Sequence, residues 1–187
     1  MFASRLAKLV LRSSIEMNRS RRLTPAGLGL IGQHGRERCM PSLFEFAGGE
    51  EALHRLESIF YASVLADPLL KPLFGDGKPE HVDHLTAFTA ESFGGPDRFS
   101  RELGFAHLIA VHRGLHIKEE QRTRFVELYM AAMDKAGMPK DESFRQAVRE
   151  HVEFGSRVAM QNSNATTDAG LHPLREVPRW KWAGDES

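Results

Sequence analysis

The chain has 187 residues, of which 41% are hydrophobic and 27% charged, values that are ordinary for one globular domain with a substantial core. Its formal net charge is zero, but residues 1–39 carry eight basic and two acidic side chains, which leaves a net charge of −6 on the remainder. That acidic remainder argues against a nucleic-acid-binding surface, and no apolar run reaches the roughly 20 residues of a membrane span.

The first 39 residues differ from the rest in being basic and rich in serine and arginine. An organelle transit peptide has these features, and so does a disordered extension, which is the simpler interpretation and the one we favour. We therefore expect a folded domain over residues 40–162 and a polar tail over residues 163–187. Cys39 is the sole cysteine, so no intramolecular disulfide can form, which fits a reducing compartment such as the cytoplasm.

Apolar residues recur at helical spacing through most of the expected domain. The pattern begins with Leu53, Leu56, Phe60 and Val64, and it predicts helices over residues 50–65, 79–93, 105–115, 119–136 and from 142 to about 162. Proline and glycine interrupt it at Pro68, Gly94-Gly95-Pro96 and Gly137-Met138-Pro139. Residues 69–78 read as a connection, and residues 97–103 as a loop or a short helical turn. No strand is predicted, so the fold class is all-α.

His112 lies on the apolar segment 105–115 and is the first candidate for chemistry. A buried histidine is most often a hydrogen-bonded core residue, but a neutral imidazole on an apolar segment can also hold the iron of a haem. A haem pocket further needs an apolar wall, with cations or donors near the propionate edge. The side chains that would form this wall are Phe60, Phe74, Leu85, Phe88, Leu108, Val111 and Phe125, each of which also fits an ordinary core.

Three further residues could act on the other side of such a group. Tyr61 could donate its hydroxyl to an iron-bound ligand, because bound oxygen carries partial negative charge. His81 lies one turn before Leu85 on the same helical face, and His84 follows it. The pairs His81/His84 and His112/His116 leave a non-haem zinc or di-iron site open, although the Glu-x-x-His repeats of di-iron bundles are missing.

Several short motifs follow one another along the expected domain. They are Phe44-Glu45-Phe46-Ala47-Gly48-Gly49, the stretch from Arg55 to Tyr61, Asp67 to Phe74, Phe93-Gly94-Gly95-Pro96, and His112-Arg113-Gly114-Leu115-His116-Ile117. Their order resembles that of the truncated haemoglobins of the second group. The resemblance covers roughly residues 41–161, and the tail from His172 to Trp182 is similar to that of some bacterial members.

The resemblance implies a two-over-two helical sandwich around haem b (iron protoporphyrin IX), with His112 as the proximal iron ligand. Tyr61, His81, Leu85 and Phe125 would line the ligand side, with Tyr61 and His81 stabilising bound oxygen. His81 could instead bind the iron itself when no ligand is present.

Members of this group usually have a tryptophan where Phe125 stands, so the phenylalanine removes an N–H donor. The resemblance also implies that Phe74 lies against the haem face. Propionate contacts would fall to His84, with His116 and Arg113 as further candidates.

The function implied by the resemblance is binding of oxygen, nitric oxide and carbon monoxide. Oxygen storage or delivery, nitric oxide detoxification and peroxidase-like chemistry would all fit, and the two redox activities would need an external reductase. Whether the protein is an enzyme stays open, as does the choice between monomer and homodimer. A gas or redox sensor, a protein-interaction module and a haemless globin-like scaffold are the alternatives.

Overall fold

The computed structural model describes residues 40–182, and these residues form eight α-helices, one short 3₁₀ helix and no strand. The predicted all-α class is therefore confirmed, whereas the expectations for residues 1–39 and Cys39 lie outside the described residues. The elements are α1 (Leu43–Ala47), α2 (Gly49–Ala66), α3 (Lys71–Phe74), α4 (Glu80–Ser92), α5 (Arg98–Glu102), α6 (Phe105–His112), α7 (Glu119–Lys135), α8 (Glu142–Asn164) and η1 (Asp168–Gly170).

Side-chain caps explain where the first and last helices begin. Ser42 precedes α1, and its hydroxyl accepts a hydrogen bond from the backbone N–H of Glu45 at 3.2 Å. The Glu45 carboxylate in turn accepts from the Ser42 N–H at 2.9 Å, which completes a capping box. Asp141 caps α8 in the same way by accepting from the Phe144 N–H at 2.9 Å.

Two glycines allow close turns after α1 and after α4. Gly48 joins α1 to α2 with a φ of 99°, a left-handed conformation that other residues adopt at a cost. A Cβ atom on Gly95 would lie 2.8 Å from both the Ala90 carbonyl oxygen and the Phe44 ring. The two glycine pairs of the sequence therefore bring α1 against the end of α4.

Helix boundaries differ from the predictions in two places. Helix α6 ends at His112, three residues early, because Arg113 is extended with a ψ of 127° and Gly114 has a φ of 82°. The connection after α2 contains the short helix α3, whereas α5 agrees with the short helical turn that was one alternative for residues 97–103. Apolar spacing alone does not reveal helices of four or five residues.

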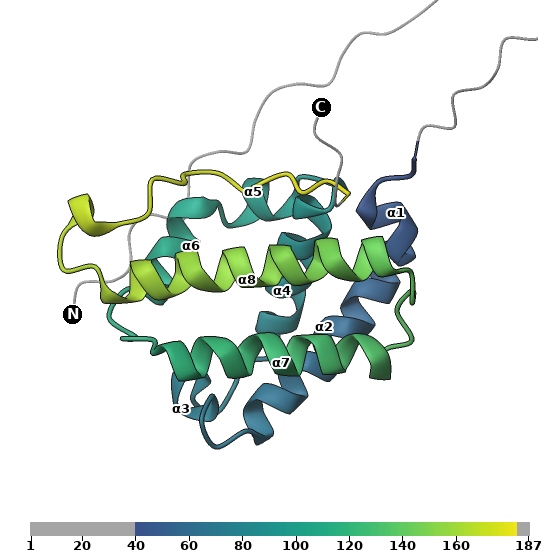
Figure 1. Ribbon diagram of the computed structural model, residues 1–187. Coiled ribbons are helices and arrows are strands. Elements are labelled where there is room, and N and C mark those ends of the chain that lie inside the picture. Colours follow the sequence, from purple (N-terminus) through teal and green to yellow (C-terminus); the bar gives the residue numbers. More distant parts are fainter. Residues whose placement is uncertain (1–39, 183–187) are drawn as a thin grey trace, which may run out of the picture. The chain divides into compact units, whose positions relative to one another are not determined.

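Four long helices form two pairs that cross each other (Figure 1). Helix α2 packs against α4 and α7, and α8 packs against α7, running antiparallel to it. The pairs α2/α4 and α7/α8 form the two-over-two arrangement that the sequence predicted. Helix α6 packs mainly against α8, so the segment carrying His112 lies away from α2.

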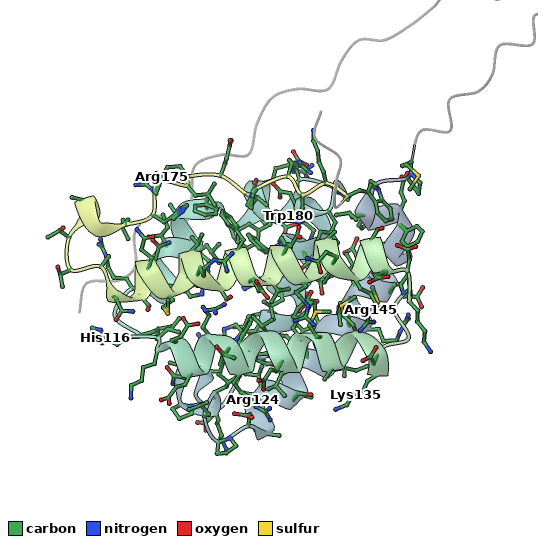
Figure 2. The ribbon with its side chains drawn as sticks, in the orientation of Figure 1. His116, Arg124, Lys135, Arg145, Arg175 and Trp180 are labelled. Carbon is green, nitrogen blue, oxygen red and sulfur yellow. The ribbon has the colours of Figure 1, made fainter. Side chains whose placement is uncertain are left out.

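The chain after η1 packs against the helices rather than leaving them. In this C-terminal segment, residues 171–182, Val177 is buried. The backbone N–H of Trp180 donates to the Ser92 carbonyl at 2.7 Å. The Trp182 indole N–H donates to the Pro41 carbonyl at 2.8 Å. Figure 2 shows Trp180 between this segment and α8. Within residues 40–182, no helix combines the length and the apolarity needed to cross a membrane.

Replacing Phe144 by alanine is expected to destabilise the fold by about 3–5 kcal/mol, because a fully buried ring leaves a cavity. Phe144 is 0% exposed, and its ring centroid lies 5.3 Å from that of Phe46 and 6.3 Å from that of Trp182. Urea unfolding followed by circular dichroism measures the loss. Met40→Ala, at a side chain that is 63% exposed, is the control and should change stability little. A loss below about 1 kcal/mol for Phe144→Ala would contradict the packing described.

Candidate functional site

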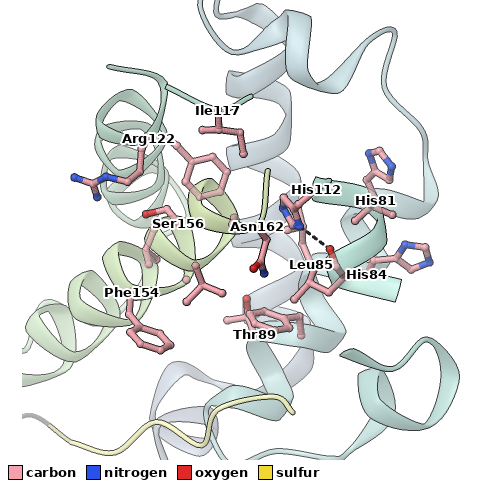
Figure 3. Close-up of a pocket in the computed structure, with 18 of the residues that line it drawn as sticks. His81, His84, Leu85, Thr89, His112, Ile117, Arg122, Phe154, Ser156 and Asn162 are labelled. Carbon is pink, nitrogen blue, oxygen red and sulfur yellow. Dashed lines mark hydrogen bonds between the residues drawn. The ribbon is translucent and has the colours of Figure 1, made fainter. Parts of the chain in front are cut away.

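A mostly apolar cavity of about 310 Å³ lies between the two helix pairs, with walls from α4, α6, α7, α8 and the C-terminal segment. Six of the seven predicted wall residues line it. These are Phe74, Leu85, Phe88, Leu108, Val111 and Phe125. Figure 3 shows Leu85, His112 and Asn162 near the middle of the view, with His81 and His84 to one side and Arg122 and Ser156 to the other.

Phe60 is the predicted wall residue that does not line the cavity. Its fully buried ring lies 4.8 Å from that of Phe125 and 4.9 Å from that of Tyr129, measured between centroids. Phe60 therefore supports Phe125 from behind. Its predicted contact with a haem stays a prediction, one that this position does not favour.

His112 ends α6 with its imidazole held in one tautomer. Its Nδ1 lies 2.7 Å from the carbonyl oxygen of Leu108, one turn earlier, as the dashed line in Figure 3 marks. A carbonyl can only accept, so Nδ1 carries the hydrogen and Nε2 keeps its lone pair. Burial lowers the pKa of His112, and the Leu108 carbonyl opposes that shift only in part. The ring is thus neutral and offers one nitrogen to the cavity that it lines.

Tyr61 and His81 form a hydrogen-bonded pair near this cavity. The Tyr61 hydroxyl oxygen lies 2.7 Å from His81 Nδ1 and accepts a hydrogen bond from the Lys78 N–H at 3.0 Å. Tyr61 is 6% exposed and is not among the lining residues, whereas His81 lines the cavity. Burial lowers the pKa of His81, with the nearby His84 and Lys78 adding to the shift. The structure therefore places Tyr61 one layer behind His81.

The three candidates for propionate binding occupy different positions. His84 lines the cavity, whereas His116 is exposed, does not line it, and has a φ of 51°. Arg113 forms an ion pair with Asp168 at 2.5 Å. Arg122 lines the cavity and pairs with Glu119. The sequence reasoning missed this cation, although it lies three residues before Phe125 on the same helical face.

Two buried titratable residues of the cavity were also missed. Glu57 is 0% exposed and lies one helical turn before Tyr61, which is the signal that could have revealed it. His151, on α8, is 5% exposed, and neither ring nitrogen has a partner within residues 40–182. Its ring packs among those of Phe88, Phe93 and Trp180. Burial lowers the pKa of His151 to about 4.

The few metal-ligating side chains of the cavity fit a cofactor that itself coordinates most positions of its metal ion. Among residues 40–182, no three His, Cys, Asp or Glu side chains gather in a metal-binding cluster. An iron porphyrin instead requires one neutral imidazole with a fixed tautomer, a wide apolar wall and a nearby cation. His112 provides the imidazole, and Arg122 provides the cation. The residues present therefore fit haem.

Comparison with known proteins agrees with this geometry. Residues 42–162 match the family of bacterial-like globins. The chain belongs to this family. The group 2 truncated haemoglobin YjbI of Bacillus subtilis is 33% identical over 117 residues, which are 63% of this chain and 87% of that protein. The predicted resemblance to the second group of truncated haemoglobins is thereby confirmed.

Solved structures of truncated haemoglobins share the fold. The group II protein of Bacillus anthracis superposes with a TM-score of 0.61 at 27% identity, over 70% of this chain and 99% of that one. A truncated oxygen-avid haemoglobin from Bacillus subtilis gives a TM-score of 0.57 at 29% identity, over 63% of this chain and 97% of that one. Membership of the globins implies a haem cofactor and the binding of diatomic gases.

Replacing His151 by phenylalanine is expected to reduce the loss of stability in acid. The unfolded histidine takes up a proton below about pH 6.5, whereas the buried one does so only below about 4, so stability falls as the pH drops through this window. Between pH 7 and 5 that contribution is about 2 kcal/mol. Urea unfolding at both pH values measures it. Phe154→Leu, which changes an uncharged wall residue, should keep the wild-type difference, and an unchanged difference in His151→Phe would contradict the assignment.

Proposed function

We propose that this globin binds haem b through His112 and holds oxygen and other diatomic gases on the opposite side, where His81 stabilises them. The observation that carries this proposal is the hydrogen bond from His112 Nδ1 to the Leu108 carbonyl. It leaves the lone pair on Nε2 of a half-buried neutral ring at the edge of an apolar cavity, which is the requirement for a proximal ligand.

The ligand side would be formed by α2, α4 and α7, because α2 packs against both α4 and α7. Leu85 and Phe125 supply apolar surface there, and His81 supplies the polar group. When bound, ferrous haem supplies the iron that takes up the gas. The protein contributes a hydrogen-bond donor beside the bound ligand and an apolar wall that keeps water away.

The tautomer of His81 decides between its two predicted roles. Within residues 40–182, His81 Nδ1 is the one acceptor bonded to the Tyr61 hydroxyl, whose oxygen accepts from the Lys78 N–H, so we assign the Tyr61 hydrogen to the bond with Nδ1. The His81 proton then lies on Nε2, which becomes a donor and has no lone pair for iron. These contacts support His81 as the group that stabilises a ligand, with Tyr61 as its positioning residue, rather than His81 as an iron ligand.

Oxygen storage or delivery and nitric oxide detoxification would use bound oxygen, whereas peroxidase-like turnover would use ferric haem and peroxide. The two redox activities need electrons from outside the chain, so turnover measured with and without an added reductase separates them from simple binding. The similarity to an oxygen-avid haemoglobin supports oxygen as the first ligand to test.

Absorption spectra of the haem-reconstituted protein, ferric, then reduced, then with carbon monoxide, test the proposal directly. A Soret band that shifts with carbon monoxide is expected. The donor role of His81 also predicts that the reduced protein lacks the sharp, split visible bands of a six-coordinate haem. Failure to retain added haem would refute the proposed function.

The substitution His112→Ala is expected to weaken haem retention by roughly tenfold or more, because the protein loses its iron ligand. Transfer of haem to an excess of apomyoglobin measures the change. His116→Ala is the matched control, because this histidine is exposed and outside the cavity lining. Equal retention in His112→Ala and the wild type would assign the proximal ligand elsewhere.

Oxygen release should become faster in both His81→Leu and Tyr61→Phe, with the larger change in His81→Leu. Loss of one hydrogen bond of about 1 kcal/mol corresponds to roughly a fivefold faster release. Because Tyr61 acts through His81, the double variant should resemble His81→Leu alone. Stopped-flow displacement of oxygen by carbon monoxide measures the rates. Additive effects would show instead that Tyr61 touches the ligand independently.

A further inference from the structure

A carboxylic acid is enclosed where α2 meets α4 and α7. Glu57 is 0% exposed, and its Oε1 accepts hydrogen bonds from the Thr89 hydroxyl at 2.8 Å and the Tyr129 hydroxyl at 2.7 Å. Its Oε2 is equally buried and has no hydrogen-bond partner within residues 40–182. The side chain nevertheless belongs to the lining of the central cavity.

These contacts decide where the acid carries its proton. No cation pairs with Glu57 in the described part of the chain, so an ionised carboxylate would be a buried and uncompensated charge. Burial raises the pKa of Glu57 to about 7, although the hydrogen bonds from Tyr129 and Thr89 oppose the shift. Since Oε1 already accepts two donors, the proton belongs on Oε2. An O–H group buried without an acceptor is costly, so Oε2 needs a partner inside the cavity.

Glu57 lies on helices that the proposed function assigns to the ligand side. It lies on α2 one turn before Tyr61, whereas His112 ends α6. Thr89, its hydrogen-bond partner, follows Leu85 by one turn on α4. The acid and its partner are therefore on the same two helices as Tyr61 and Leu85.

We propose that Glu57 is a proton store for the ligand side of the cavity, where its Oε2–H donates to a water molecule. When negative charge increases in the cavity, the proton passes through that water toward it. The carboxylate left behind is then held by the hydroxyls of Thr89 and Tyr129. This inference rests on the proposed function, because it assumes that a haem ligand occupies the cavity.

Three other titratable groups of the acid or of the cavity stay neutral near pH 7. Burial first, and then the charge of Glu57, raise the pKa of Tyr129 well above its usual value of 10. Burial lowers the pKa of His151, which lines the cavity from α8, to about 4, and the pKa of His81 on α4 is also lowered. The cation Arg122 lines the cavity from α7 and pairs with Glu119, and His84 and His107 line it as well. Glu57 therefore changes charge close to neutral pH, whereas Tyr129, His151 and His81 do not.

Infrared difference spectroscopy on the haem-loaded full chain tests the proposal. Photolysis of bound carbon monoxide should shift the C=O stretching band of a protonated carboxyl, and D₂O should move that band to lower frequency. We expect the signal at pH 6, half of it at about pH 7, and none well above that. Glu57→Gln, which keeps an acceptor for Thr89 and Tyr129, should remove the signal at every pH.

Glu91→Gln is the matched control. Glu91 is 3% exposed and accepts hydrogen bonds from the Ser100 hydroxyl and N–H, but it does not line the cavity. This variant should keep the wild-type signal. A carboxyl band that is unmoved by photolysis would overturn the proposal and leave Glu57 as a structural link between helices. Failure to form any carbon monoxide complex would instead refute the proposed function, which the Soret band reports separately.

Discussion

The crossing of the two helix pairs governs the other features of this globin. Helix α2 contacts both α4 and α7, and its fully buried residues Leu53, Leu56 and Phe60 hold the crossing together. Between the pairs lies a cavity lined by residues of α4, α6, α7 and α8. Because densely packed interiors leave few voids, a cavity of this size indicates a binding site.

Three polar side chains of this apolar site are each held by a hydrogen bond on one of their two polar atoms. His112 is held by a backbone carbonyl of its own helix, which leaves one nitrogen for the proposed iron. His81 is held by Tyr61, which leaves its other nitrogen for the proposed bond to a ligand. Glu57 is held at one oxygen by two hydroxyls, which leaves the other oxygen for the proposed proton. In each case the hydrogen bond on one polar atom of the side chain determines whether the second polar atom carries a proton.

The C-terminal segment is part of the site as well as of the fold. Leu174 and Pro178 line the cavity, and Trp180 packs against the buried ring of His151. The hydrogen bonds of Trp180 and Trp182 to Ser92 and Pro41 tie this segment to the end of α4 and to the chain just before α1. The residues beyond the match to the globin family therefore help to close its pocket.

The sequence by itself determined the fold class, the family and most of the cavity wall. Helical spacing and the glycine pairs are local signals, and the order of motifs is specific even though each motif is weak. Six of seven wall residues and both key histidines, His81 and His112, line one cavity. The tertiary structure alone decided that Phe60 supports Phe125 from behind and that Tyr61 stands behind His81. It also revealed Glu57, His151 and Arg122 as cavity residues, since periodicity tells which residues are buried but not which atoms meet across helices.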